Sequence, residues 1–298
     1  MNNFIKYFYG IKVDKIMYDK KNYYFMYDNY LYRLLVYEEN DVELLIDTNR
    51  KLLGNTLVSE IIFNRNNEIV SVYKNIGYLL IKVYANSNKY ISLEEINYLA
   101  NSLYKEKLKI NYGLLWSRKI DYLEELITEN GKKYPLMVDS FNYFVGLAEN
   151  AISYYNDILI DENYKYVISH KKIKFDDTVD VLYNPLNIVF DYRVRDIAEY
   201  IKNAFFLNKN NIFTELDHYF MNNTLSLMEV KILIARILYP SFYFDLYENI
   251  LVDDEEEKIL IDIISNLDNY EEYLASVISY FRQFYDIDEI SWLKKEDY

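Results

Sequence analysis

The chain has 298 residues, of which 51% are apolar and 18% aromatic, with 35 tyrosines. It contains only 6 glycines and 3 prolines, a composition that excludes collagen-like repeats and extended disorder. It contains no cysteine, which excludes disulfide frameworks, thiolate metal sites and cysteine nucleophiles. The formal net charge of −14 argues against nucleic acid as a partner, because a phosphate backbone would be repelled.

The sequence also carries no signal for a membrane. No apolar run approaches the roughly 20 residues of a membrane-spanning helix. The first residues, MNNFIKYFYGIKVDK, place Lys6 and Lys12 inside their apolar stretch and lack a small-residue cleavage site, so no signal peptide is expected. We therefore expect synthesis in the cytoplasm and no membrane insertion.

Residues 1–85 are predicted to form a small antiparallel β lobe. Aromatic and β-branched residues dominate its first part, which predicts one strand, with Gly10 inside it, and then a hairpin that turns at Asp28 and Asn29. A helix is expected near 41–62, followed by a second hairpin with a polar loop at 74–77. The short polar stretch ANSNK that follows is expected to act as a hinge.

Residues 86–298 are predicted to form a mainly helical lobe. Ser92 and Glu95, like Ser226 and Glu229, have the spacing of a capping box at the start of an apolar stripe. Segment 163–194 interrupts the helices and is expected to form short strands and loops. This order predicts an α+β protein-kinase-like fold with two lobes, in which the β lobe carries one helix.

A kinase-like layout implies a nucleotide site in the cleft between the lobes, with a basic residue on the third strand that holds its phosphates. Arg33 has that position, and its expected partner is Glu43 or Asp47 on the following helix. The alternative is that Arg33 lies on an edge strand with its head group in water. No glycine-rich phosphate loop is present.

Phosphotransfer in this fold uses a His-x-Asp-x-x-x-x-Asn loop, in which the aspartate is the catalytic base. His170 supplies the histidine, but Lys172 replaces the aspartate and Asp177 replaces the asparagine. A protonated lysine is a hydrogen-bond donor, so it cannot accept the proton of a substrate hydroxyl. The alternative for His170 is a core residue that supports a loop.

Several segments together resemble one family. They are ISHKKI, YNPLNIVFDYRVRDIAEYIK, ILYPSFYFDLYE, WSRKIDYLEE and FNYFVGLAENAI. They are similar to the spore-coat branch (YutH/CotS type) of the aminoglycoside and choline kinase-like phosphotransferase superfamily, over most of residues 90–285.

The resemblance implies roles for three further residues. Asp196 would open a helix and accept hydrogen bonds from backbone amides of 169–173, which is a structural role. The metal-binding aspartate would fall on Asn184, and a neutral amide is a poor ligand for Mg²⁺. Asp191 lies nearby, and we expect it to be the more exposed of the two aspartates.

The expected function is that of a pseudokinase. By resemblance, the protein would act as a binding or structural protein with other spore coat proteins, on the coat of a forming endospore, with no cofactor. The alternative is an active small-molecule phosphotransferase that uses ATP and Mg²⁺, with Asp177 or Asp191 as a displaced base or ligand. A plain interaction module is the third possibility.

Overall fold

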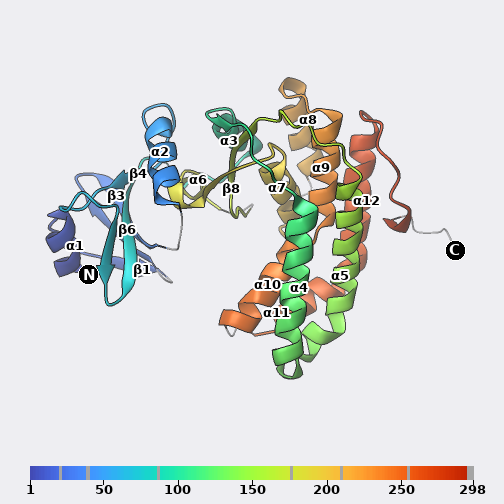
Figure 1. The fold of residues 1–298 in the computed structure, drawn as a ribbon, viewed down its shortest axis with the longest axis horizontal. Coiled ribbons are helices and arrows are strands. Elements are labelled where there is room, and N and C mark those ends of the chain that lie inside the picture. The colour runs from blue at the N-terminus through green and yellow to red at the C-terminus, as the bar shows by residue number, and fades with distance from the viewer. Residues whose placement is uncertain are drawn as a thin grey trace. The chain divides into compact units, whose positions relative to one another are not determined.

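The computed structural model describes residues 1–19, 22–37, 41–85, 88–174, 177–208, 211–253 and 256–293. The chain forms two compact units (Figure 1). The first unit comprises Met1–Lys105 and Val167–Phe190, and the second comprises Glu106–Tyr166 and Asp191–Tyr298. The first unit thus contains two segments beyond the predicted β lobe, and the boundary after residue 85 stays a prediction.

The first unit contains both sheets of the described chain, except for one end residue each of β8 and β9. Its elements are α1 (Asn2–Tyr9), β1 (Met17–Asp19), β2 (Asn22–Tyr27), β3 (Tyr30–Val36), α2 (Val42–Leu52), β4 (Glu60–Ile62), β5 (Val70–Tyr73), β6 (Ile76–Val83), α3 (Leu93–Ala100), β7 (Tyr104–Lys105), β8 (Tyr166–His170), α6 (Val179–Leu182), the 3₁₀ helix η2 (Pro185–Asn187) and β9 (Ile188–Asp191).

The larger sheet has the strand order β1-β2-β3-β6-β4, with β5 also paired to β6, and all of these pairs are antiparallel. Both predicted hairpins therefore lie in one sheet, as expected. Asp28 and Asn29 have φ of 50° and 63°, and Lys74 and Asn75 have φ of 50° and 64°, the left-handed pair that tight two-residue hairpins require. The second loop is shorter than predicted, because β6 already begins at Ile76.

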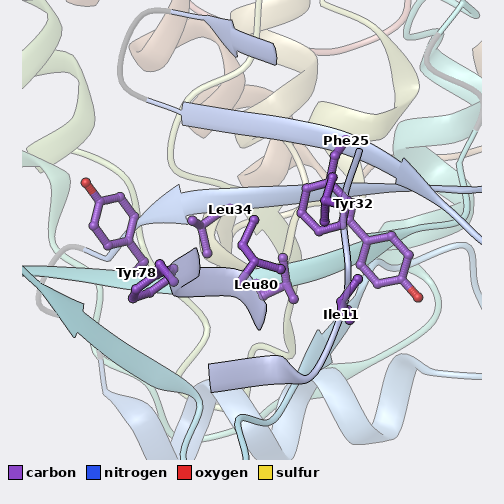
Figure 2. Close-up of a cluster of buried hydrophobic side chains, with 9 residues drawn as sticks. Ile11, Phe25, Tyr32, Leu34, Tyr78 and Leu80 are labelled. Carbon is purple, nitrogen blue, oxygen red and sulfur yellow. The ribbon is translucent and has the colours of Figure 1, made fainter. Parts of the chain in front are cut away.

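Strand alternation divides the apolar side chains between the two faces of this sheet. One face carries Phe25, Tyr32, Leu34, Tyr78 and Leu80 (Figure 2). These side chains pack with Phe4 and Ile5 of α1. Phe25 and Tyr32 are register partners, and their rings stack at a centroid distance of 5.4 Å. The other face packs against Leu45 of α2 and includes Leu35, Leu79 and Ile81.

The first segment of the chain is a helix, and the predicted strand there is wrong. In α1, Phe4 and Ile5 are buried while Tyr7 is 71% exposed. Gly10 ends the helix with φ of 74°, and its N–H donates to the carbonyl of Lys6 at 3.1 Å. Gly10 is therefore a helix C-cap, and the lobe carries one helix more than expected.

The predicted helix near 41–62 is shorter in the structure. Asp41 caps α2 by accepting the N–H of Leu44 at 3.0 Å, and the helix ends at Leu52. An additional strand, β4, follows and pairs with β6. The buried Asn49 holds the connection, since its side chain donates to the carbonyl of Ser59 at 2.8 Å.

The second unit is helical, as predicted. Its elements are α4 (Tyr112–Asn130), the 3₁₀ helix η1 (Gly131–Lys133), α5 (Pro135–Asn156), α7 (Arg195–Phe206), α8 (Ile212–Asn222), α9 (Leu227–Leu238), α10 (Ser241–Asp253), α11 (Ile259–Ser265), α12 (Leu267–Arg282) and the 3₁₀ helix η3 (Ser291–Leu293). The capping box of Ser226 and Glu229 forms at the start of α9. Within the described ranges, no helix is long and apolar enough to cross a membrane.

Candidate functional site

A pocket of about 930 Å³ opens on the sheet of the first unit. Strands β1, β2, β3 and β6 form one part of its wall, and the segment around α6 forms another. Its lining residues are Met17, Asp19, Asn22, Tyr23, Tyr24, Met26, Asn29, Tyr30, Leu31, Arg33, Leu35, Val83, Tyr84, Ala85, Val181 and Asn184. The size is in the range of small-molecule sites, and four tyrosines and three asparagines make the wall polar.

Arg33 lies in this pocket and forms an ion pair with Asp180. The Nη2 atom of Arg33 is 2.5 Å from Oδ2 of Asp180, and the Asp180 side chain is fully buried. Thr178 also donates its hydroxyl to Oδ1 of Asp180 at 2.6 Å. Arg33 therefore faces part of the 163–194 segment, which we predicted to interrupt the helices. The alternative of an edge strand is wrong, because β3 lies between β2 and β6.

The predicted partners of Arg33 are both wrong. Glu43 is exposed in the first turn of α2, and Asp47 pairs with Lys51 at 2.7 Å, four residues along the same helix. Asp180 takes their place because α6 brings a buried carboxylate to the face of the sheet that carries Arg33. A buried carboxylate needs a cationic partner, so much of the charge of Arg33 is already compensated within the protein.

Asn184 lines the same pocket, but its side chain already has a structural role. Its Oδ1 atom accepts the N–H of Leu186 at 3.1 Å and caps η2. The remaining group that Asn184 offers to the pocket is an amide NH₂, which is a donor. This geometry does not fit a magnesium ion, which requires oxygen ligands and favours carboxylates.

His170 is a buried residue that supports the loop, as in the alternative interpretation. Its side chain is 2% exposed, and its Nε2 lies 2.8 Å from the carbonyl oxygen of Leu182. A carbonyl can only accept, so Nε2 donates its proton there. The histidine therefore connects β8 to α6.

Lys172 is exposed, and its backbone is held by Asn187, a residue that we did not predict. The side-chain Oδ1 of Asn187 accepts the N–H of Lys172 at 3.2 Å, and its Nδ2 donates to the carbonyl of Lys172 at 2.9 Å. The N–H of Lys171 donates to the backbone carbonyl of Asn187 at 2.8 Å. A residue with this local role leaves no distinctive spacing in a single sequence.

Asp177 uses its carboxylate to bind the backbone of Lys174. Its Oδ2 atom accepts the N–H of Lys174 at 2.7 Å, and its own N–H donates to the carbonyl of Lys174 at 3.1 Å. The backbone carbonyl of Asp177 accepts the N–H of Ile91 at 3.1 Å. The carboxylate thus connects Asp177 to the backbone of Lys174.

Asp191 belongs to the second unit and is buried, and it is more exposed than Asp196, as expected, by a marginal amount only. Only 4% of it is exposed, against 2% of Asp196. Its carboxylate accepts hydrogen bonds from the hydroxyl of Tyr112 and from the N–H of Tyr192, and it pairs with Arg195. Burial raises the pKa of Tyr112 well above its usual value, so this hydroxyl stays a donor at neutral pH.

Asp196 lies in the first turn of α7. Its near-complete burial requires polar partners. The predicted hydrogen bonds to 169–173 would join residues of the two units, and they stay a prediction.

A buried ion cluster connects α7 with α9 in the second unit. Glu199 accepts hydrogen bonds from Lys202 at 3.0 Å and from Arg236 at 2.8 Å. Lys202 is 2% exposed and also donates to Ser241 at 2.5 Å. Burial alone would raise the pKa of Glu199, but Lys202 and Arg236 outweigh it and lower that pKa to about 2. The signal in the sequence was that charged residues stand at positions where the patterns of these two helices predict apolar side chains.

Several of these site residues are held by contacts within the protein. Among the described residues, no group of three or more histidine, aspartate or glutamate side chains could hold a metal ion. Asp177 and Asp191 each have a structural role in the contacts given above. The pocket around Arg33 is nevertheless large enough for a ligand.

Comparison with known proteins agrees with this fold. Residues 2–277 match the model of the family described as "Spore coat putative kinase YutH". Endospore coat-associated protein YutH of Bacillus subtilis (strain 168) is 27% identical over 205 residues, which is 61% of this chain and 60% of that protein. The chain thus spans about three fifths of the length of this curated relative.

Solved structures of aminoglycoside phosphotransferases share the fold. An aminoglycoside phosphotransferase from Alicyclobacillus acidocaldarius has a TM-score of 0.64 at 10% identity, over 91% of this chain and 92% of that one. Spectinomycin phosphotransferase APH(9)-Ia, in complex with ADP and spectinomycin, has a TM-score of 0.58 at 12% identity, over 98% and 95% of the two chains. At such low identity these likenesses show the kinase-like fold alone. Because the family match spans nearly the whole chain, this protein belongs to the spore coat YutH family.

Proposed function

We propose that this protein is a pseudokinase that acts as a binding protein of the spore coat, in contact with other coat proteins. Its family and the description of its relative as endospore coat-associated support the coat as its place of action. Synthesis in the cytoplasm would precede assembly onto the forming spore. No cofactor is required for this role.

The contacts of Asp177 and Asp191 are the observation that carries the proposal. A displaced catalytic site would need one of them as a base or as a ligand for Mg²⁺. The carboxylate of Asp177 accepts the N–H of Lys174, and Asp191 is buried against Tyr112 and Arg195. Freeing Asp191 would remove this carboxylate from the partly buried guanidinium of Arg195 and from the buried hydroxyl of Tyr112, which is costly.

The position of the catalytic base supports the same conclusion. A general base must accept a proton within about 3 Å of the substrate hydroxyl. Lys172 offers an exposed ammonium group instead. Loss of a general base typically lowers the rate by about 10²–10⁴-fold, and the loss of a metal ligand adds to this.

Turnover of ATP by the purified chain tests this proposal. We expect phosphate release in the presence of Mg²⁺ to stay at background in the native chain, Asp177→Asn and Asp191→Asn alike. A robust magnesium-dependent rate that either substitution abolishes would instead establish the alternative, an active small-molecule phosphotransferase with a displaced aspartate.

A second measurement separates ligand binding from catalysis. A ligand that binds only the folded state raises the melting temperature, so thermal unfolding with ATP, with and without Mg²⁺, reports occupancy of the pocket. If ATP raises the melting temperature, we expect the rise to be the same with and without Mg²⁺ and smaller in Arg33→Gln. A shift that requires Mg²⁺ would show that the metal site is intact.

The place of action is tested in cells. A fluorescent fusion of the full chain, expressed during sporulation in an endospore former, should collect at the coat of the forming spore. The fluorescent protein alone is the control and should stay diffuse. A fusion that stays diffuse as well would contradict the coat assignment, whatever the result of the ATP assay.

A further inference from the structure

A second concave surface lies in the other unit, lined by residues of α8 and α12 and the residues just after α12. It is a groove of about 800 Å³ with an aromatic floor. The ring of Tyr280 lies 5.6 Å from that of Phe213 on α8 and 5.5 Å from that of Phe284, just after α12. Phe284 is 63% exposed, so the groove offers an apolar surface to a partner.

One carboxylate is fixed beside this floor. Asp217 of α8 is exposed, and its Oδ1 atom accepts the hydroxyl of Tyr280 at 2.8 Å. Burial and this hydrogen bond raise the pKa of Tyr280, so its hydroxyl remains the donor at neutral pH. The bond orients the carboxylate at the rim of the groove and leaves its second oxygen available to a ligand.

The combination of groups selects a cation. A carboxylate pairs with ammonium or guanidinium groups, and the faces of aromatic rings attract the same cations. The hydroxyl of Ser276 donates to the carbonyl of Glu272 at 2.8 Å, so its lone pairs remain free to accept an N–H group. None of the described residues that line the groove is basic, and the nearby Arg282 pairs with Glu289 at 3.4 Å.

Charge and exposure favour a segment of a protein as the occupant. The groove is much larger than one side chain, and Phe284 in its lining is 63% exposed. Aromatic and arginine side chains are enriched where proteins meet, and the net charge of −14 would steer a basic partner toward this chain.

We infer that the groove between α8 and α12 binds a basic segment of a partner protein, with an arginine or lysine side chain paired to Asp217 over the aromatic floor. This inference rests on the proposed role as a binding protein and names the chemistry of the partner. It does not depend on the pocket around Arg33.

Two matched peptides test the inference on the full chain. One is a short synthetic helix of alanine, leucine and arginine, and the other carries citrulline, which has the shape of arginine without its charge, at each arginine position. Fluorescence anisotropy at physiological salt should give about tenfold tighter binding of the arginine peptide. Asp217→Asn should remove most of this difference, while Asp262→Asn on the exposed surface of α11 should keep it.

Phe284→Ala should weaken the binding of both peptides, and Ile261→Ala, at a half-exposed position of α11, should not. Equal affinity for the two peptides, no binding of either, or an equal loss in Asp217→Asn and Asp262→Asn would overturn the inference. Circular dichroism of each variant confirms that it is folded.

The same variants in the fluorescent fusion separate this inference from the proposed function. If the native fusion reaches the coat, Asp217→Asn should reduce its accumulation and Asp262→Asn should not. If the native fusion stays diffuse, the coat assignment fails, and the peptide measurements still decide the role of the groove.

Discussion

At the scale of single residues, Glu199 shows how a buried carboxylate stabilises the cationic side chains around it. It compensates both Lys202 and Arg236, of which Lys202 is almost fully buried. Removing one partner of such a cluster leaves uncompensated charge inside the protein. The protein therefore tolerates these buried charges only when all members of the cluster are present.

We predict that Glu199→Gln lowers the free energy of unfolding by about 3–5 kcal/mol, because Lys202 and Arg236 lose their counter-charge. Urea denaturation of the full chain measures the change. Glu248→Gln is the matched control: Glu248 pairs with Lys119 at 2.7 Å, and both side chains are partly exposed, so its loss should cost less than about 1 kcal/mol. Similar values for the two variants would contradict the prediction.

The same residue predicts a dependence on pH. The pKa of Glu199 is lowered from 4.5 to about 2 in the folded protein. A lowered carboxyl pKa stabilises the fold above the unfolded value, and this contribution is lost as pH falls toward the folded value. The stability difference between the native chain and Glu199→Gln should therefore narrow between pH 4.5 and pH 2. A difference that stays constant over this range would show that Lys202 and Arg236 do not lower the pKa of Glu199.

Arg33 shows which part of the site a sequence can reveal. Its place on the third strand could be predicted, because it is a lone charge in an apolar strand pattern. Its partner could not, because Asp180 lies far along the chain and reaches Arg33 only through the packing of α6 on the sheet. The contact of Asp191 with Tyr112 of α4 could not be predicted for the same reason, since the two residues lie far apart in the sequence.

At the scale of elements, the hairpins and capped helices were predictable because their signals are local. Asn29 and Asn75 tolerate the positive φ that the turns need, and the Ser226 cap forms as its spacing indicates. Helix α1 was missed because its aromatic residues favour strands. Its amphipathic pattern stabilises a helix only when Phe4 and Ile5 pack against the sheet.

Two glycines in helical contexts should respond to alanine with opposite signs. Gly10 has φ of 74° at the end of α1, so Gly10→Ala should destabilise the protein by about 1 kcal/mol. Gly146 lies inside α5, where an added Cβ would meet nothing within 4 Å. Gly146→Ala should therefore stabilise the protein by about 0.5–1 kcal/mol. Thermal or urea denaturation of both variants checks the pair, and a shared sign would be inconsistent with the assigned conformations.

For the whole molecule, the net charge of −14 is the dominant electrostatic feature. The ion pairs with exposed partners, such as Lys51 with Asp47, contribute little to stability. The excess of carboxylates, by contrast, repels itself in the compact state more than in the unfolded chain. A basic partner would relieve this repulsion, as the groove between α8 and α12 suggests.

This excess charge predicts how salt affects stability. Raising NaCl from about 10 mM to about 150 mM shortens the screening length from about 30 Å to about 8 Å, so repulsion between distant carboxylates weakens and the melting temperature at pH 7 should rise. The control is the same pair of scans near the isoelectric point of about 4.7. There the net charge is close to zero, and added salt should leave the melting temperature unchanged or lower it. A melting temperature that falls with salt at pH 7 would mean that attractive pairs outweigh the net charge, and the electrostatic case for a basic partner would weaken with it.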